Sequence, residues 1–326
     1  MTNQLERAYK YCETVTKKHA KSFYFASRFL PENKRKPIYA LYAFCRHVDD
    51  QIDKTEIANE LQAIEEVNKW KINLERVYQH DKLSENFSVT ANHTHHEGLA
   101  HLDEQISREL VLLAWGDVLK HYKIPLHLPL ELIKGVLMDT YIKRYESFNN
   151  LYIYCYRVAS TVGLMSSEIF GYKDKSALVY AEAMGIAMQI TNILRDIAED
   201  AKMQRIYIPQ DELKTFGISE EQIFNHEISE SFIELMKFQI RRARQFYEKA
   251  ERGILLLEPD TRFTVLIASR LYAKILDCIE AQNYDVFSKR AHTTLIQKIF
   301  SLPRLWLETK KMKFDPADFE KSPNLR

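Results

Sequence analysis

Two pairs of aspartates, each pair four residues apart, carry the strongest chemical signal in this sequence. Asp49 and Asp53 lie in "CRHVDDQID", and Asp196 and Asp200 lie in "NILRDIAED". On an α-helix, side chains four residues apart share one face, so each pair points two carboxylates in the same direction. Like charges at this spacing destabilise an isolated helix. Each pair therefore requires a compensating cation.

The second pair extends a polar stripe along an otherwise apolar segment. Gln189, Asn192, Asp196 and Asp200 are three, four and four residues apart, and most of the residues between them are apolar. One acidic pair alone is usually a solvated helix face. A polar stripe on an apolar helix instead indicates a face that is turned toward an enclosed space. Gly185 in the same segment costs about 1 kcal/mol relative to alanine, which indicates close packing or room for a ligand.

Oxygen ligands on two helices, without a cluster of thiolates or imidazoles, are typical of Mg²⁺, with Mn²⁺ as the alternative. Mg²⁺ completes its coordination with water and substrate phosphate oxygens. We therefore expect a substrate that carries a diphosphate, surrounded by cationic and hydroxyl side chains. The candidates are His19, Lys21, Ser22, Arg46, Arg195 and Arg205, although each alone is more often a surface residue.

Aromatic residues are abundant, with 17 Phe, 18 Tyr and 3 Trp. Most of them should pack in the core. A few rings that face an enclosed space would stabilise a carbocation through the ring quadrupole. Loss of diphosphate assisted by Mg²⁺, followed by a carbocation among aromatic rings, is isoprenoid chemistry.

The composition excludes several other classes of protein. Of the 326 residues, 46% are hydrophobic and 28% charged, and the net charge of +1 gives no indication of a nucleic-acid partner. There are only 8 glycines and no dinucleotide or Walker-type loop. The isolated cysteines, at 12, 45, 155 and 278, predict neither a zinc site nor disulfides. Without a signal peptide or an apolar run of roughly 20 residues, we expect a cytoplasmic protein, with contact at the membrane surface left open.

Helical periodicity runs through nearly the whole chain and predicts an all-α fold. We expect one large helical domain over 1–312, followed by a flexible tail at 313–326. The segment 80–101 is rich in polar and turn-forming residues and contains four histidines. Because these histidines lack regular ligand spacing, a surface loop is the better interpretation than a metal site.

Several longer motifs resemble the squalene and phytoene synthases, which join two prenyl diphosphates head to head. The resemblance runs from about residue 8 to 310 and is closest to the phytoene synthases of carotenoid biosynthesis. The motifs are "HAKSFYFASRFLP" (19–31), "YAFCRHVDDQID" (42–53), "YCYRVASTVGLMS" (154–166), "GIAMQITNILRDIAEDAKMQRIYIPQDEL" (185–213) and "LYAKILDCIEAQNYDVFSKRA" (271–291).

This resemblance implies an isoprenoid synthase fold whose central cavity is lined by both aspartate motifs. The implied metal ligands are Asp49, Asp53, Asn192, Asp196 and Asp200. The implied diphosphate-binding residues are His19, Ser22, Arg46, Arg195 and Arg205, with Lys289 or Arg290 near the C-terminus. The implied prenyl pocket is lined by Tyr154, Val158, Gly163, Gln189 and Tyr272.

The implied reaction condenses two geranylgeranyl diphosphates, through a cyclopropyl diphosphate, to phytoene without NADPH. Small residues at Ala26 and Ser27 favour the C20 substrate over the C15 one. The alternative is a dehydrosqualene or squalene synthase that acts on farnesyl diphosphate, and Arg157 in "YCYRVAST" is similar to squalene-forming bacterial relatives. A non-catalytic assembly factor of the same fold is less favoured because both aspartate pairs are intact.

The basic segment 238–253, "FQIRRARQFYEKAERG", is a candidate for peripheral contact with a membrane. An amphipathic helix packed against the core is the competing interpretation. The sequence does not predict an oligomeric state.

Overall fold

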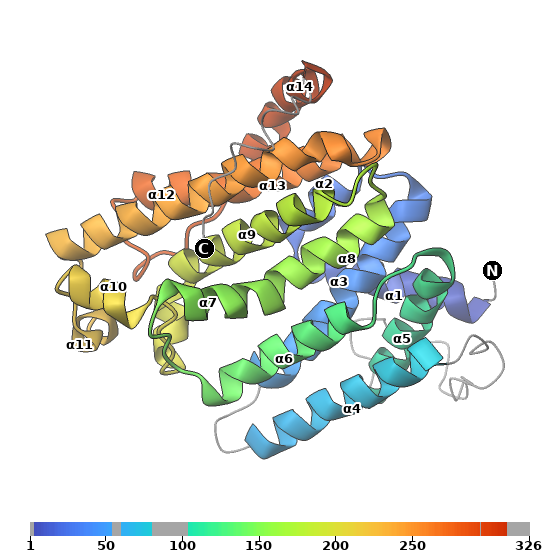
Figure 1. The fold of residues 1–326 in the computed structure, drawn as a ribbon, viewed down its shortest axis with the longest axis horizontal. Helices are drawn as coiled ribbons and strands as arrows, with labels where there is room; N and C mark the ends of the chain where they lie inside the picture. Colours follow the sequence, from blue (N-terminus) through green and yellow to red (C-terminus); the bar gives the residue numbers. More distant parts are fainter. Residues whose placement is uncertain (1–2, 54–59, 80–103, 294, 312–326) are drawn as a thin grey trace.

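The computed structural model describes residues 3–53, 60–79, 104–293 and 295–311, and the side chains of residues 53, 60 and 295–301 are outside this description. These ranges are helical and contain two isolated β-bridges but no longer strand. The predicted all-α fold is confirmed (Figure 1). The expected loop at 80–101 and the expected tail at 313–326 lie outside the described residues and stay predictions.

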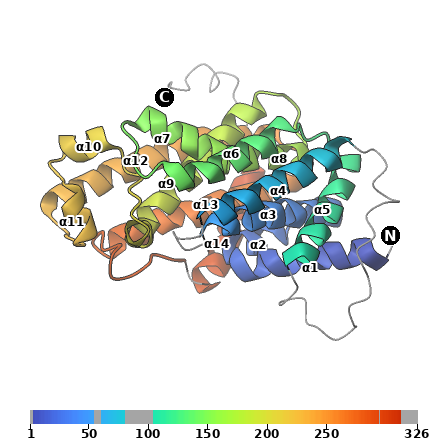
Figure 2. The ribbon, with the colours of Figure 1, turned by 90° about the horizontal axis from the view of Figure 1, so that it is seen from below.

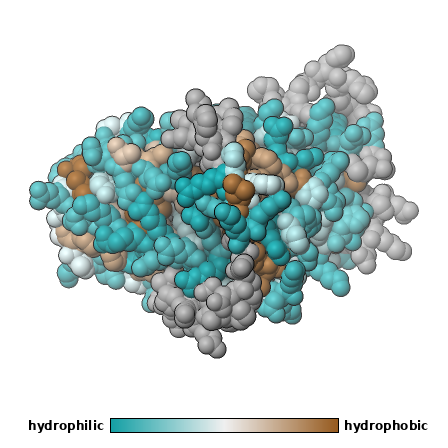
Figure 3. All heavy atoms as spheres, turned by 90° about the horizontal axis from the view of Figure 1, so that it is seen from above, coloured by the Kyte–Doolittle hydropathy of each residue, from teal (hydrophilic) through white to brown (hydrophobic). Residues whose placement is uncertain are grey.

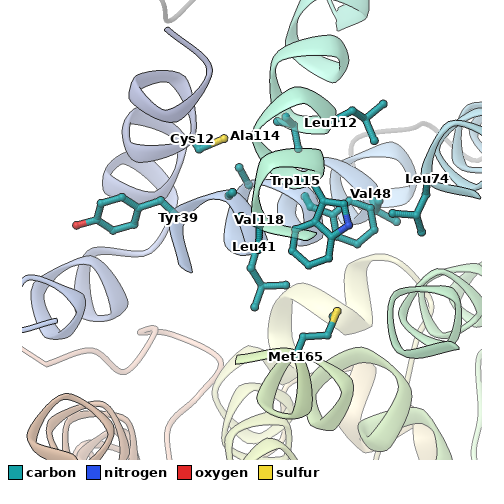
Figure 4. Close-up of a cluster of buried hydrophobic side chains, with 14 of the residues drawn as sticks. Cys12, Tyr39, Leu41, Val48, Leu74, Leu112, Ala114, Trp115, Val118 and Met165 are labelled. Carbon is teal, nitrogen blue, oxygen red and sulfur yellow. The ribbon is translucent and has the colours of Figure 1, made fainter. Parts of the chain in front are cut away.

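The N-terminal half is organised around α3 (Glu32–Asp53), which carries the first aspartate pair. Five helices pack against α3, and they are α1 (Asn3–His19), α4 (Glu60–Gln79), α5 (Glu104–His121), α6 (His127–Tyr141) and α8 (Thr161–Phe170). Fully buried aromatic side chains fill the space between them, and the ring of Phe44 stacks on Trp115 with centroids 5.6 Å apart. Figure 4 shows Trp115 at the centre of this cluster. These contacts place α3 inside the core of the N-terminal half.

The C-terminal half is organised around α9 (Ala177–Lys202), which carries the polar stripe. This helix packs along α12 (Glu230–Arg252) and also contacts α8 and α13 (Pro259–Ala281). Two further helices, α2 (Lys21–Ser27) and α14 (Leu295–Lys311), pack on α13. The small helices α10 (Gln210–Thr215) and α11 (Glu220–Phe224) lie at the end of the molecule away from the N-terminus (Figures 1 and 2).

The helical segment before α9 is not continuous in the structure. It consists of α7 (Phe148–Cys155), a π-helical turn (Tyr156–Ser160) and α8. Helix α9 approaches this turn closely, since a Cβ atom on Gly185 would lie 2.4 Å from the backbone nitrogen of Ser160. The prediction that Gly185 serves close packing is confirmed.

Hydrogen bonds tie the segment after α9 to the segment before α7, and we call this connection the backbone brace. The N–H groups of Ile206 and Gln210 donate to the carbonyls of Lys143 and Tyr145 at 3.0 and 2.8 Å. Beside them, Arg144 forms a two-nitrogen ion pair with a glutamate of α11 at 2.7 and 2.8 Å. The brace fixes the C-terminal end of α9 relative to α7.

Among the described helices, α9 is the one whose length and apolar composition would allow it to cross a bilayer. Over half of that stretch is buried inside the protein, and its remaining face carries the polar stripe. Its apolar character therefore belongs to the core of the fold. All four cysteines are free, as their spacing predicts.

Candidate metal and diphosphate site

The polar stripe of α9 lies on the half-buried face of the helix. Gln189, Asn192, Asp196 and Asp200 are each partly accessible, whereas neighbours such as Ile193 are buried. The Asn192 amide donates to the side-chain oxygen of Gln189 at 3.2 Å. The sequence prediction that these four residues share one face of a mostly buried helix is confirmed.

The first aspartate pair lies at the C-terminal end of α3. Asp49 is half-buried and pairs with Arg46 at 3.3 Å, and Arg46 also pairs with Asp50. Asp53 is the last residue of α3, so helix geometry places it on the same face as Asp49. Arg46 thus supplies the cation that this acidic helix end requires.

Two tyrosines lie near the charged and amide groups of the candidate site. The hydroxyl of Tyr272, on α13, donates to the Asn192 side-chain oxygen at 2.9 Å. Burial raises the pKa of Tyr42 on α3, the nearby Arg46 charge opposes this rise, and Tyr272 and Asp49 add to it. Tyr42 therefore lies within electrostatic range of both α3 charges and Tyr272. Tyr272 thus contacts the stripe of α9 directly, and Tyr42 lies on the helix that carries Asp49.

Asp196 is held by two guanidinium groups. Arg195 reaches its two carboxylate oxygens at 2.8 and 2.5 Å, and Arg290 reaches the same two oxygens at 2.8 and 3.1 Å. Burial alone would raise the pKa of Asp196, but the hydrogen bonds from both arginines outweigh it and lower the pKa below its usual value. Of the two predicted C-terminal candidates, Arg290 makes this contact and the Lys289 side chain is exposed.

A buried polar cluster lies beyond Asp200. The Arg205 side chain is buried, and its backbone N–H donates to the Asp200 carbonyl at 3.0 Å. Burial raises the pKa of Tyr207, with further contributions from the charges of Asp139 and Asp200. Asp139 is buried and accepts hydrogen bonds from Tyr207 at 2.7 Å and from Tyr154 at 2.9 Å.

Asp139 and Tyr207 were not singled out from the sequence. The available signal was an acidic residue at the end of the apolar run "IKGVLMD", because an acid on a buried helix face needs hydrogen-bond donors. The cluster changes the interpretation of Tyr154, which is almost fully buried with its hydroxyl engaged by Asp139.

The remaining predicted residues have different positions. Val158 is half-buried in the π-helical turn, whereas a Cβ on Gly163 would lie 2.8 Å from the Ala181 carbonyl, so this glycine serves the contact between α8 and α9. His19 is exposed at the end of α1, and Ser22 is half-buried on α2.

Two observations bear on chain length and on Arg157. Ala26 and Ser27 are buried, and Ala26 packs in a small cluster with α13 and α14, so they line the α2–α13 contact. Arg157 pairs with Glu131 of α6 at 3.0 Å.

The arrangement of ligands suits a metal that shares its coordination with a substrate. Among the described side chains, which exclude that of Asp53, no three His, Cys, Asp or Glu groups come together to enclose an ion. Each of the two helices carries two aspartates, and an amide oxygen lies beside the pair on α9. Such a set of oxygen ligands fits Mg²⁺, which keeps coordination positions for water and phosphate. A hollow at α10 and α11, lined by residues such as Glu146, Lys214 and Glu220, contains none of the predicted site residues.

Comparison with known proteins identifies the family. The family model for squalene/phytoene synthase matches residues 16–297. The chain belongs to the squalene/phytoene synthase family. It is 37% identical over 311 residues to the 15-cis-phytoene synthase of Synechococcus elongatus, covering 92% of each chain. It is 35% identical over 305 residues to phytoene synthase 1 of Arabidopsis thaliana, covering 92% of this chain and 66% of the plant protein.

Solved structures agree with this assignment to the squalene/phytoene synthase family. A dehydrosqualene synthase in complex with a ligand superposes with a TM-score of 0.77 at 26% identity, covering 94% of this chain and 98% of the other. The squalene synthase HpnC from Alicyclobacillus acidocaldarius gives a TM-score of 0.71 at 23% identity, over 87% of this chain and 97% of its own, which supports the fold. The family consists of divalent-metal-dependent prenyltransferases, and this chain is one of them.

Proposed function

We propose that this protein is a Mg²⁺-dependent phytoene synthase that condenses two geranylgeranyl diphosphates head to head through a cyclopropyl diphosphate. The observation that supports the proposal is the half-buried stripe from Gln189 to Asp200 on one face of α9, in which Asn192 accepts a hydrogen bond from Tyr272. Identity to curated phytoene synthases over 92% of the chain supports the choice of product.

In this proposal, Asp49 and Asp53 on one side, and Asn192, Asp196 and Asp200 on the other, hold the cations. Bound Mg²⁺ supplies the positive charge that makes diphosphate a better leaving group. Arg46, Arg195 and Arg205 add fixed positive charge around the phosphates, since guanidinium groups bind phosphate oxygens with paired hydrogen bonds. His19, Ser22 and Lys289 are further proposals for diphosphate contact.

The tyrosine-lined region between α3, α9 and α13 would protect the carbocation after the diphosphate leaves. Burial raises the pKa of Tyr42, so this residue presents a ring and a neutral hydroxyl in place of a nucleophilic phenolate. Tyr272 contributes a second ring and holds Asn192 through its hydroxyl. Val158 is half-buried in the π-helical turn that packs on α9 and is proposed to border the prenyl chains, with Tyr154 and Gly163 behind it. Phytoene formation ends by loss of a proton, so NADPH is not expected to be required.

A second candidate is a synthase that acts on farnesyl diphosphate. The similarity to a solved dehydrosqualene synthase favours it. Ala26, which supported the C20 substrate in the sequence, packs against α13 and α14, so a larger residue there would disturb this contact directly. The substrate is therefore best decided by product analysis.

The deciding experiment incubates the purified protein and Mg²⁺ with farnesyl or geranylgeranyl diphosphate, with and without NADPH, and identifies hydrocarbons by mass spectrometry. A C40 triene from the C20 substrate without NADPH is expected. A C30 product would establish the second candidate. Absence of product from both substrates would overturn the enzymatic proposal and favour a non-catalytic role.

We also propose that the protein contacts a membrane surface peripherally, because a C40 hydrocarbon does not stay dissolved in water. The basic segment 238–253 does not favour such contact. Its apolar face packs on α9, Arg242 pairs with Glu212, and Arg244 pairs with Glu280. Helix α14 fits better, because Trp306 and Leu307 are 46% and 49% exposed.

The exposed face of α14 combines these apolar side chains with basic ones. Lys310 lies over the ring of Trp306 at 4.0 Å, and Arg304 and Lys311 are exposed on the same helix. Tryptophan beside lysine and arginine is typical of helices that rest in the headgroup region of anionic bilayers. The helix projects from the rest of the molecule in Figure 1, and the surface seen from that side is otherwise mostly hydrophilic (Figure 3).

A further inference from the structure

Asp196 has no oxygen lone pair left for a metal ion in the structure. A carboxylate offers about four lone-pair directions in its plane. Each Asp196 carboxylate oxygen accepts one hydrogen bond from Arg195 and one from Arg290, at 2.5 to 3.1 Å. A cation that binds Asp196 must therefore displace at least one of these guanidinium groups.

The two arginines differ in how firmly they are held. Arg195 lies within α9, its side chain is 13% exposed, and it also interacts with Tyr272. Arg290 lies between α13 and α14, its side chain is 54% exposed, and its second partner is the exposed Glu199 at 3.5 Å. Displacing Arg290 returns a charge to water, whereas displacing Arg195 would leave a charge buried and unpaired. Arg290 is the group that can leave.

The backbone around Arg290 is fixed, so its departure requires only a side-chain rotation. The Gln282 amide donates to the carbonyls of Asp285 and Lys289 at 2.9 and 3.0 Å. Asp285 accepts from the backbone of Ser288 at 2.8 Å, and the next residue after Arg290, an alanine, is buried. A released guanidinium would stay within side-chain reach of Asp196, where the phosphates of a metal-bound diphosphate would lie.

We propose that Arg290 closes the Asp196 site when no substrate is bound, and that it exchanges Asp196 for the substrate diphosphate when a divalent cation binds. This inference rests on the proposed diphosphate chemistry and concerns the order of binding at that site. A cation alone must displace Arg290 without compensation. A cation that arrives with a diphosphate gives Arg290 a new partner with two hydrogen-bonding oxygens. Metal and diphosphate binding are therefore positively coupled.

The test measures Mn²⁺ binding to the purified full chain by electron paramagnetic resonance, with and without inorganic pyrophosphate. The Arg290→Gln variant removes the displaced charge and keeps a polar side chain of similar length. The matched control is Lys202→Gln, which removes an exposed positive charge from the last turn of α9, next to the same acidic residues. Thermal unfolding of both variants checks that they are folded.

Without pyrophosphate, Arg290→Gln should bind Mn²⁺ about five- to tenfold more tightly than the wild type, which corresponds to the loss of one competing charged hydrogen-bond pair. Lys202→Gln should change the affinity by less than about twofold, as expected for a screened surface charge. The factor by which pyrophosphate increases the Mn²⁺ affinity should be several-fold smaller in Arg290→Gln than in the wild type.

Equal or weaker Mn²⁺ binding in Arg290→Gln would overturn the proposal, and so would an equal gain in Lys202→Gln. These measurements need no turnover. If the protein makes no phytoene but Arg290→Gln shows the predicted gain in Mn²⁺ affinity, this inference stands and the proposed function is wrong. If the protein makes phytoene but Arg290→Gln shows no gain, the proposed function stands and this inference is wrong.

Discussion

Asp196 forms ion pairs with two arginines and lies within the α9 stripe. Replacing Asp196 or Asp53 with asparagine removes a negative ligand and keeps the shape of the side chain. We expect each variant to lose at least about a hundredfold in product formation, since the cation would no longer be held against the diphosphate. Product mass per unit time at saturating Mg²⁺ measures this loss.

The matched control is Asp277→Asn on α13, where an exposed aspartate pairs with Arg244. This variant should keep wild-type activity, and all three proteins should keep wild-type helical circular dichroism. Normal turnover by Asp196→Asn at saturating Mg²⁺ would contradict the metal assignment.

Asp196 should also contribute to the pH dependence of stability. Its pKa in the folded protein is below its ordinary value of 3.8, because the arginine hydrogen bonds outweigh burial. The ionised form therefore stabilises the fold above about pH 4, and this contribution is lost as the pH falls through the lowered pKa. Urea unfolding of the wild type and Asp196→Asn should differ at pH 6 and converge toward pH 2 to 3. A constant difference down to pH 2 would contradict this account.

Single residues also mark the limit of sequence reading. The stripe from Gln189 to Asp200 could be predicted because helical periodicity fixes which residues share a face. The pairing of Asp139 with Tyr154 and Tyr207 could not, because it joins residues 15 and 68 positions apart through tertiary packing. For the same reason, the choice between Lys289 and Arg290 required the structure.

Helix α9 depends on the absence of a side chain at Gly185. Alanine would ordinarily gain about 1 kcal/mol over glycine inside a helix. At Gly185 the new Cβ would lie 2.4 Å from the Ser160 backbone, so α9 and the π-helical turn would have to separate. We expect Gly185→Ala to lose roughly 1–3 kcal/mol in the free energy of unfolding, as overpacked cores do, and to lose activity because the stripe on α9 moves.

Gly116→Ala is the matched control, because it lies within α5 and its added Cβ would meet a valine methyl at an ordinary 3.5 Å. That variant should be neutral or slightly more stable in urea unfolding. If Gly185→Ala were equally stable, close packing at this position would be disproved.

Helix boundaries show which elements a sequence can specify. Long helices such as α9 and α12 carry the prediction of an all-α fold, because their periodicity is sustained over many turns. The helix α11 was missed, since 5 residues are too short for a periodic pattern. The π-helical turn was missed, because an extra residue within a helical turn leaves the helical periodicity around it nearly unchanged.

For the molecule as a whole, the exposed face of α14 predicts how the protein meets a bilayer. Replacing Trp306 and Leu307 with serine removes two side chains whose burial contributes about 1.5–3 kcal/mol each when complete. We therefore expect at least a tenfold fall in binding to vesicles that contain anionic lipid, measured by flotation. Activity on dispersed substrate should change little.

Val179→Ser is the matched control, since it removes an equally exposed apolar side chain from the start of α9. It should bind vesicles as the wild type does. Wild-type protein that does not float with anionic vesicles would remove the proposal of membrane contact, and equal losses in both variants would show that α14 has no special part.

The backbone brace makes the two ends of the site mechanically unequal. It anchors the Asp200 end of α9 to the segment before α7, and Arg144 extends the attachment to α11. The opposite boundary consists of the α13–α14 connection, where Arg290 is mainly solvent-exposed. Hydrogen bonds hold the backbone on both sides, but only the Arg290 side ends in an exposed side chain that can rotate away from α9. Any opening that admits a second prenyl diphosphate or releases a long hydrocarbon should therefore begin with rotation of the Arg290 side chain, and cross-linking that side chain to α9 should slow turnover while cross-linking the braced side should not.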